Sequence, residues 1–366
     1  MKNKMKINAL LETDPELTVR TEQSGPVVLS TRLRLARNLS NHRFPGWAKK
    51  SQRREVLSVC KGAIESLELM SGGTTLVVDD LSDLEKQILM ERRMISRELM
   101  ESESGGAVCI SRDQSCVIMI NEEDHLRIQL LRPGLNFKEM WRTIDGVDDG
   151  IEERLDYAFD RNLGYLTACP TNVGTGLRAS AMLHLPALVI ENHMEKVVRA
   201  VNHLGLAVRG LFGEGSEAYG SIFQISNQQT LGESEEEILS GLTNVLNSII
   251  EQENNARLKM LQTKPEKVCD KIGRAYGILR NAHILSSTET MKLLSLLRLA
   301  VDLGALDEAE RSEIDRFYIE GQPGHIQFLA NNLIDPRERD LYRARILREH
   351  FSHLPLLNFD NLANYS

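Results

Sequence analysis

The sequence predicts an α+β fold followed by an all-α C-terminal region. Within residues 27–180, strand-like apolar runs such as 74–79 alternate with segments of helical apolar spacing. Two short apolar runs, 107–111 and 116–120, flank the polar turn RDQS, a pattern typical of a β-hairpin. Beyond Thr263-Lys264-Pro265 the spacing is helical almost throughout, and the residue before a proline is biased away from the helical region.

Capping signals predict where several helices begin. A serine or aspartate followed three residues later by glutamate forms a capping box, in which each side chain binds the other residue's backbone N–H. Such pairs predict helices over 82–100 and from Ser234 to about Gln262, and two further helices starting at Ser286 and Asp335. The segment GLFGEGSEAYG, between strands predicted near 206–209 and 221–226, has instead the glycine content of a mobile flap.

Composition narrows the functional classes. The net charge of -8 argues against an extended nucleic-acid surface. The five cysteines contain no C-x-x-C pair, so their spacing predicts neither a disulfide framework nor a zinc site. The N-terminus lacks the apolar core of a signal peptide, and no run approaches the ~18 apolar residues of a membrane span. We therefore expect a cytoplasmic protein with no nucleic-acid or membrane partner.

Four segments share a common resemblance. They are STRLRLARNL at 30–39, NEEDHLR at 121–127, LGYLTACPTNVGTGLRAS at 163–180 and VRGLFGEGSEAYGSIFQISNQQTLG at 208–232. NEEDHLR alone would also fit a solvated acidic loop. Together the four resemble the catalytic domain of the phosphagen kinases, the ATP:guanidino phosphotransferases, over about residues 25–255. The resemblance implies a mostly antiparallel sheet flanked by helices.

The layout of the chain selects a branch of that family. The members that act on small molecules carry a helical domain before the arginine-rich strand, whereas only a short segment precedes Val27 here. They also lack the helical extension found beyond residue 260. This layout resembles the branch that phosphorylates arginine side chains within proteins, with a catalytic domain over 1–258 and a helical domain over 259–366.

The resemblance implies that arginines bind the phosphates of ATP. A guanidinium grips phosphate with two parallel hydrogen bonds and keeps its charge at all relevant pH values. The matching positions are Arg32, Arg34, Arg127, Arg178 and Arg209, with Ser30 and His125 as further nucleotide contacts. Because Arg32 and Arg34 are two residues apart, they would share one face of a strand, whereas Arg37 would point elsewhere.

The same resemblance implies two catalytic carboxylates and one cysteine. Glu123 matches the carboxylate that accepts a proton as the N–P bond forms, and Glu214 matches the flap glutamate of the arginine-specific members. Cys169 matches the reactive cysteine, where we expect it to orient the substrate. Glu122 and Asp124 would support the loop or a metal-bound water. The implied cofactors are ATP and Mg²⁺, and no protein side chain is assigned as a metal ligand.

A second site is predicted at the helix that begins DPRERDLYRARILRE. Arginines in a first helical turn oppose the helix dipole, so a bound anion would relieve the conflict. Arg337, Arg339 and Arg343 with Asp340 would suit phosphoarginine, since the arginines fit its phosphate and the carboxylate fits its guanidino group. An ordinary helix with surface ion pairs is the alternative.

Other functions remain open from the sequence. Gly174 to Ala179 fits the dinucleotide pattern G-x-G-x-x-A, but that interpretation leaves NEEDHLR and the arginine motif without a role. His184, expected on the helix after GTGLR, is interpreted as structural.

A kinase for free guanidino substrates and a non-catalytic phosphoarginine-binding adaptor are alternatives. The implied partners are proteins with exposed arginines, an activator protein, a protease–chaperone machinery of regulated proteolysis or stress response, and a second copy of the chain in a homo-oligomer.

Overall fold

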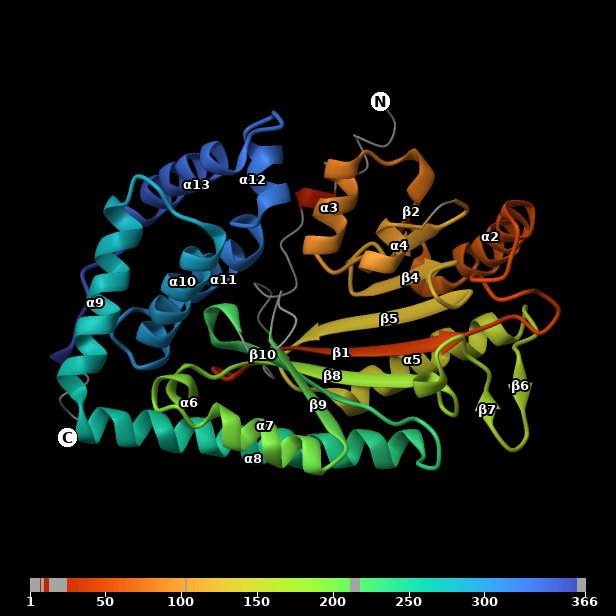
Figure 1. The fold of residues 1–366 in the computed structure, drawn as a ribbon, viewed down its shortest axis with the longest axis horizontal. Coiled ribbons are helices and arrows are strands. Elements are labelled where there is room, and N and C mark those ends of the chain that lie inside the picture. Colours follow the sequence, from red (N-terminus) through yellow and green to blue (C-terminus); the bar gives the residue numbers. More distant parts are fainter. Residues whose placement is uncertain (1–6, 8–9, 13–24, 103, 211–217, 361–366) are drawn as a thin grey trace. The chain divides into compact units, whose positions relative to one another are not determined.

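The computed structural model describes residues 7, 10–12, 25–102, 104–210 and 218–360. The chain divides into two compact units (Figure 1). The first comprises Met1–Glu16, Ser30–Ala181 and Ser226–Asn244. The second comprises Leu17–Leu29, Met182–Ile225 and Val245–Ser366. None of the helices in the described ranges is both long and apolar enough to cross a membrane.

The first unit is built on an antiparallel sheet. Its strands follow the order β2-β3-β4-β5-β1-β8, and each neighbouring pair from β2 to β1 is antiparallel. The strands are β1 (Val28–Arg37), β2 (Thr74–Val77), β3 (Ala107–Ile110), β4 (Cys116–Ile120), β5 (Leu126–Pro133) and β8 (Leu177–His184). The predicted hairpin around RDQS is confirmed as β3 and β4, and the predicted α+β class is confirmed with it.

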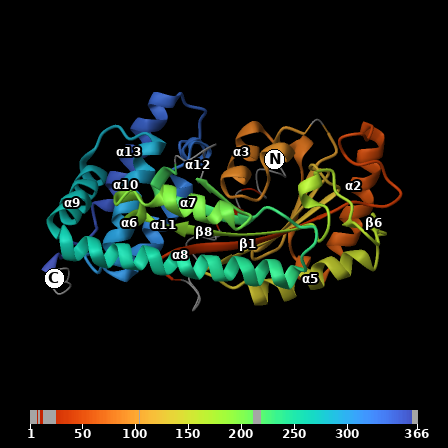
Figure 2. The same cartoon turned by 60° about the horizontal axis from the view of Figure 1, so that its bottom comes forward.

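Helices cover both faces of this sheet. They are α2 (Lys50–Glu65), α3 (Asp83–Glu91), α4 (Arg97–Met100) and α5 (Phe137–Glu152). Val108, Val117 and Met119 belong to the same buried cluster as residues of α3 and α4. Side chains alternate along a strand, so Cys109 and Ile118 point to the other face. Figure 2 shows α3 and α5 on opposite sides of the strands.

The helix predicted over 82–100 is interrupted, and to that extent the prediction was wrong. Its start is correct, because Ser82 and Glu85 exchange the hydrogen bonds of a capping box. The chain then turns at Arg93, whose φ of 60° is left-handed, and restarts as α4. The Arg93 carbonyl accepts a hydrogen bond from Gln129 Nε2 at 2.8 Å. The turn places Met94 and Ile95 in the core. Burial of these two apolar side chains stabilises the interrupted helix.

Short elements complete the first unit. β6 (Phe159–Asp160) and β7 (Gly164–Tyr165) form a small antiparallel ribbon, and η1 (Glu68–Met70), η2 (Val78–Asp80) and η3 (Pro170–Asn172) are single 3₁₀ turns. Within the motif segment 163–180, regular strand before Cys169 is limited to the two residues of β7. Helix α8 (Glu235–Thr263) begins in this unit at the predicted capping box, where Glu237 N donates to Ser234 Oγ at 3.3 Å.

The second unit is mostly helical. It holds α6 (Pro186–Ile190), α7 (Met194–His203), η4 (Tyr219–Ser221), η5 (Glu308–Glu310) and the five C-terminal helices. These are α9 (Pro265–Asn281), α10 (Ser287–Asp302), α11 (Arg311–Glu320), α12 (Pro323–Leu329) and α13 (Pro336–Phe351). The end of β8 continues the strand order with β10 (Ile222–Asn227) and β9 (Leu206–Gly210). The all-α character predicted for the C-terminal region is confirmed.

His184 lies on a strand and not on a helix, so that prediction was wrong. It is the last residue of β8, and the first helical residue after it is Pro186. The strand is buried almost throughout, and the apolar residues Ala181, Met182 and Leu183 interrupt the alternation just before His184, so the spacing there does not distinguish a strand from a helix. The same observation removes the dinucleotide interpretation, because GTGLRA is followed by a strand instead of a helix.

A buried ionic cluster surrounds His184 in the second unit. Asp302 lies 2.9 Å from Arg257 and also pairs with Arg311, while Arg298 pairs with Asp315 at 2.8 Å. Arg298 Nη1 lies 3.2 Å from His184 Nδ1, and the other ring nitrogen lies 2.8 Å from Ser295 Oγ. Burial lowers the pKa of His184 to about 3, so its imidazole is neutral. The structural role predicted for His184 agrees with these contacts.

Candidate active site

Three of the predicted phosphate-binding arginines share one face of the sheet. In the pairing of β1 with β5, Arg34 lies opposite Gln129, Ala36 opposite Arg127, and Arg32 opposite Leu131. Directly paired residues point to the same face, so Arg32, Arg34 and Arg127 project together. Burial lowers the pKa of Arg34 well below its ordinary value, and repulsion from Arg32, Arg127 and Arg178 adds to the shift. The structure thus gathers four of the five predicted arginines.

This arginine cluster fits an anionic ligand. Like charges held together in a partly buried place are unfavourable unless an anion compensates them. In addition, the buried Nε of Arg34 has no hydrogen-bond partner among the described residues. Buried donors are nearly always paired, so an unpaired one beside three further cations indicates a missing acceptor. The phosphate oxygens of ATP have the charge and geometry to supply it.

The NEEDHLR loop is fixed by its first residue. Asn121 adopts a left-handed φ of 57°, and its amide donates to the carbonyls of Arg53 and Gly105, each at 2.8 Å. Arg53 returns a hydrogen bond from Nη2 to the Asn121 carbonyl at 2.8 Å. The Asn121 N–H donates to the His125 carbonyl at 2.9 Å and closes the turn between β4 and β5. The loop therefore presents its acids from a fixed backbone.

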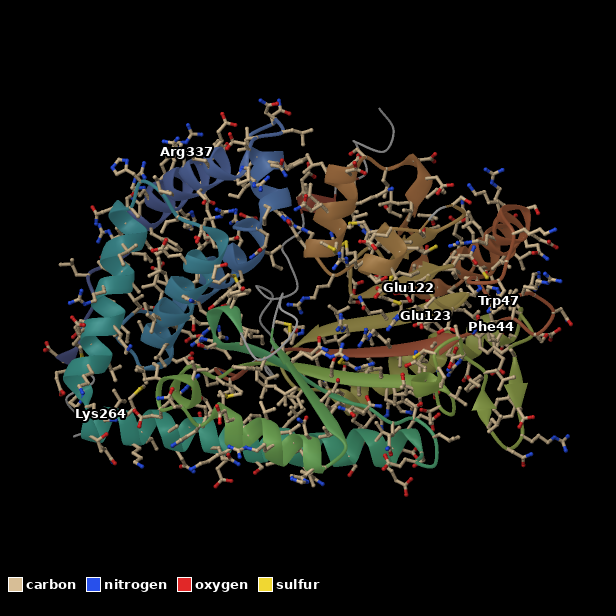
Figure 3. All side chains as sticks on the ribbon, viewed as in Figure 1. Phe44, Trp47, Glu122, Glu123, Lys264 and Arg337 are labelled. Carbon is tan, nitrogen blue, oxygen red and sulfur yellow. The ribbon has the colours of Figure 1, made fainter. Side chains whose placement is uncertain are left out.

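The three carboxylates of the loop point in different directions. Glu122 is buried and pairs with Arg127 at 2.7 Å. Asp124 is buried as well, and its Oδ1 accepts from Asn38 Nδ2 and from the Ala168 N–H, both at 2.6 Å. Glu123 alone is exposed. Figure 3 shows Glu122 and Glu123 side by side in the chain near the end of the strands. This division suits the predicted roles of support for Glu122 and Asp124 and of catalysis for Glu123.

The carboxyl of Glu123 has a raised pKa. Partial burial is the main cause, and the negative charges of Asp124 and Glu122 add to it, while Arg127 opposes the shift. A carboxylate with a higher pKa accepts a proton more readily. Burial raises the pKa of Asp124 as well, but its Oδ1 already accepts two hydrogen bonds, so Glu123 is the acid of the loop that combines a raised pKa with an exposed side chain.

Cys169 lies beside the acid loop. The hydrogen bond from Ala168 N–H to Asp124 joins the residue before Cys169 to the residue after Glu123. Asn38 strengthens the connection by donating to the Leu166 carbonyl at 3.1 Å. The Cys169 sulfur lies 3.0 Å from Thr171 Oγ1 and is partly accessible. The segments that carry Glu123 and Cys169 are thus connected by hydrogen bonds.

His125 and Ser30 are enclosed by protein. The Nδ1 of His125 accepts from the Leu39 N–H at 3.0 Å, and Nε2 donates to the Arg43 carbonyl at 3.0 Å. Burial lowers the pKa of His125 to about 4, which keeps the ring neutral. These contacts support a structural role for the ring. Ser30 is buried at the start of β1. Nucleotide contacts by either residue stay predictions.

Sequence reasoning missed two supports of the site. Asn38 binds Asp124, the Leu166 carbonyl and the His125 N–H, yet an asparagine after the arginine motif carries no distinguishing signal. Arg37, on the opposite face from Arg34 as predicted, pairs with Asp148 of α5 at 2.6 Å and lies 3.5 Å from the centre of the Tyr165 ring. It also explains one glycine of GTGLR: a Cβ at Gly176, where φ is +66°, would lie 2.5 Å from Arg37 Nη1.

Two further predicted site residues are Glu214 and Arg209. Glu214 lies outside the described residues. Arg209 is exposed on β9, which belongs to the second unit. Their assignments as flap carboxylate and as fifth phosphate-binding arginine stay predictions.

The predicted phosphoarginine site lies at the start of α13 in the second unit. Asp335 and Glu338 form the predicted capping box, so two carboxylates already face the helix N-terminus. Arg337 is exposed (Figure 3), and Arg339 donates to the Ile334 carbonyl at 3.3 Å. Arg343 is buried, and donates to the Gly321 and Leu285 carbonyls and to Asp340 at 2.6 Å. Arg337 and Arg339 are therefore the more accessible cations of this set.

Comparison with known protein families identifies the class. Residues 55–256 match the family model of the ATP:guanido phosphotransferase C-terminal catalytic domain. A lombricine kinase crystal structure aligns with a TM-score of 0.56 at 26% identity, covering 66% of this chain and 71% of that one. A duplicated taurocyamine kinase from Schistosoma mansoni aligns with a TM-score of 0.58 at 24% identity, covering 67% of this chain and 35% of that one, which supports the fold.

More similar relatives define the branch. Residues 265–362 match the model of the protein-arginine kinase McsB C-terminal domain. A protein-arginine kinase of Brevibacillus brevis is 46% identical over 88% of this chain and 91% of that protein. The protein-arginine kinases of Pelotomaculum thermopropionicum and Bacillus subtilis are each 43% identical over 92% of this chain, and over 96% and 93% of their own lengths. The chain belongs to the protein-arginine kinase family.

Proposed function

We propose that this protein transfers the γ-phosphate of ATP to the guanidino group of arginine side chains in proteins. The observation that carries the proposal is the cluster of Arg32, Arg34, Arg127 and Arg178, with an unpaired buried donor on Arg34, in the unit that also holds the exposed Glu123. Family membership supports the same activity.

The residues would divide the work as follows. The arginines, with Arg209 as the fifth, hold the phosphates and balance the charge that spreads over the transferred group. A guanidinium nitrogen attacks the γ-phosphorus, the N–P bond forms, and the bond from phosphorus to the leaving oxygen of ADP breaks. Glu123 accepts the proton released from that nitrogen, while Glu214 and Cys169 orient the guanidino group.

Mg²⁺ is part of the proposal as a companion of the nucleotide. Across the described ranges, no group of three histidine, cysteine, aspartate or glutamate side chains is placed to hold a metal ion. Such a set is not required, since Mg²⁺ is commonly held by substrate phosphates, waters and at most one or two carboxylates. When bound, it would neutralise charge on the phosphate oxygens.

The proposals on domain boundaries, partners, oligomeric state, biological role and location rest on the resemblance to the family. We keep the division into a catalytic domain over 1–258 and a helical domain over 259–366, which agrees with the gap between the two family matches. An activator protein, a protease–chaperone machinery, a homo-oligomer, a role in regulated proteolysis and a cytoplasmic location are supported by the resemblance alone. A free guanidino kinase and a phosphoarginine-binding adaptor are the alternatives.

Incubation of the full chain with ATP and Mg²⁺ tests the activity. Casein, supplied beside free arginine in parallel reactions, is expected to gain phosphate on arginine. The modification should be acid-labile and should map to arginine residues by mass spectrometry. Phosphorylation of free arginine alone would favour the small-molecule alternative, and the absence of transfer to either acceptor would favour the adaptor.

The phosphoarginine site at α13 gives a separate expectation. Arg339→Ala is expected to weaken binding of free phosphoarginine by more than tenfold, because a charge-assisted hydrogen bond contributes roughly 1.5–3 kcal/mol. Isothermal titration of the full chain, with the Glu123→Gln change in all samples to remove turnover, measures the affinity. Arg345→Ala is the matched control, since Arg345 is an exposed arginine of the same helix. Equal affinities of the parent, Arg339→Ala and Arg345→Ala proteins would show that Arg339 at the start of α13 does not bind phosphoarginine.

A further inference from the structure

The loop between β1 and α2 exposes a tryptophan beside the acid loop. Trp47 has an exposed fraction of 86%, the largest among the apolar side chains of the described residues. Tryptophan is costly to leave in water and is enriched at binding surfaces. In Figure 3, Trp47 and Phe44 lie at the same end of the strands as Glu122 and Glu123.

This loop, residues 38–49, contacts the acid loop directly, and the first turn of α2, which follows it, contacts the acid loop as well. On one side, His125 accepts from the Leu39 N–H and donates to the Arg43 carbonyl, while its ring packs edge-on against Phe44 with centroids 6.0 Å apart. On the other side, Arg53 of α2 and Asn121 exchange two hydrogen bonds of 2.8 Å. The position of Trp47 is therefore set relative to Glu123, which lies between His125 and Asn121 in the chain.

Within the loop, the backbone holds Trp47 outward. The N–H groups of Trp47 and Ala48 both donate to the Phe44 carbonyl, at 2.9 and 3.0 Å. The Phe44 ring packs against His125, whereas the side chain of Trp47 is exposed. An exposed aromatic side chain on a closed turn loses little conformational freedom when it meets a partner.

The loop and the start of α2 carry positive charge. Arg43, Lys49 and Lys50 are exposed, and the sequence from Asn38 to Arg54 contains no aspartate or glutamate. This segment of chain therefore exposes one aromatic side chain together with cations. Such a surface complements a polypeptide that carries apolar and acidic residues.

We propose that the loop over residues 38–49, together with Lys50 at the start of α2, is a docking surface for the part of the substrate polypeptide that flanks the target arginine. Trp47 contacts an apolar side chain of that segment, and Lys49 and Lys50 pair with its acidic residues. The inference rests on the proposed placement of the acceptor arginine at Glu123. It predicts that arginines near acidic and apolar residues are preferred substrates.

Steady-state kinetics of the full chain tests the proposal. The substrates are two synthetic peptides with one arginine each, one flanked by glutamate and phenylalanine and the other by lysine and glycine. Trp47→Ala is expected to raise the KM of the acidic peptide on the order of tenfold and to leave kcat nearly unchanged. Trp47→Phe should retain most of the affinity. Changing both Lys49 and Lys50 to glutamate should reduce the preference for the acidic peptide.

Fluorescence supplies an independent readout. The chain has two tryptophans, so in a Trp141→Phe background the emission reports Trp47 alone. The acidic peptide should change this emission and ATP should not. A response to ATP alone would assign the loop to the nucleotide and overturn the proposal. An unchanged KM in Trp47→Ala, with Glu123→Gln inactive, would also overturn it while leaving the proposed function intact. Normal turnover in Glu123→Gln would instead contradict the function itself.

Discussion

Replacement of Glu123 by glutamine is expected to lower the turnover of protein-arginine phosphorylation by a factor of about 10²–10⁴. The amide keeps the shape of the side chain but cannot accept the proton that leaves the guanidino group. Nucleotide binding should be nearly unchanged, because the phosphates are assigned to the arginines. Initial rates on casein, measured beside nucleotide affinity, separate the two effects. If the Glu123→Gln variant phosphorylates casein at the rate of the parent protein, Glu123 is not the proton acceptor.

The pH dependence of turnover in the parent protein gives a second test of Glu123 as the proton acceptor. Glu123 must be deprotonated to accept a proton, so turnover falls as the pH drops through its pKa, which is raised above the ordinary 4.5. Glu98 is an exposed carboxylate whose charge contributes to that rise. Glu98→Gln should therefore move the acid limb to lower pH and leave turnover at neutral pH unchanged. If the acid limb of the pH profile lies at the same pH in Glu98→Gln and in the parent, a group other than Glu123 controls the fall in turnover.

Asp302→Asn is expected to lower the free energy of unfolding by about 3–5 kcal/mol. The side chain of Asp302 is fully buried, and it is the shared partner of Arg257 and Arg311, with Arg298 at 3.7 Å. The asparagine would leave three buried guanidinium groups with one negative charge fewer. Chemical denaturation followed by circular dichroism measures the loss.

Asp270→Asn is the matched control. Asp270 pairs with Arg274 at 2.8 Å in the same unit, but both side chains are largely exposed to water. Exposed pairs contribute at most about 1 kcal/mol. Equal stability of the two variants would show that burial does not govern the contribution of the Asp302 cluster.

Local signals in the sequence predicted the helix starts well. A capping box needs only residues three positions apart, so Ser82, Ser234 and Asp335 identify their helices without knowledge of the fold. The alternation of side chains along a strand likewise separates Arg32 and Arg34 from Arg37 by their spacing alone, and the register of β1 agrees with it.

Contacts between distant residues could not be predicted in this way. Arg37 and Asp148 are 111 positions apart, and Asn38 and Asp124 are 86 positions apart. Neither pair has a local pattern, because the sheet and α5 must form before the partners meet. The prediction for His184 failed for another reason: three consecutive apolar residues, Ala181 to Leu183, interrupt the alternation by which a strand is recognised.

The buried cluster around His184 also limits how the C-terminal helices can be used outside this protein. The matched C-terminal segment starts at residue 265, yet Asp302 is paired with Arg257, and Arg298 donates to the carbonyl of Pro26. A fragment cut at that boundary would leave Asp302 and Arg298 without these partners. A fusion protein or truncation that is to keep the C-terminal helices folded must therefore also retain the segment around Pro26, the end of β8 and the second half of α8.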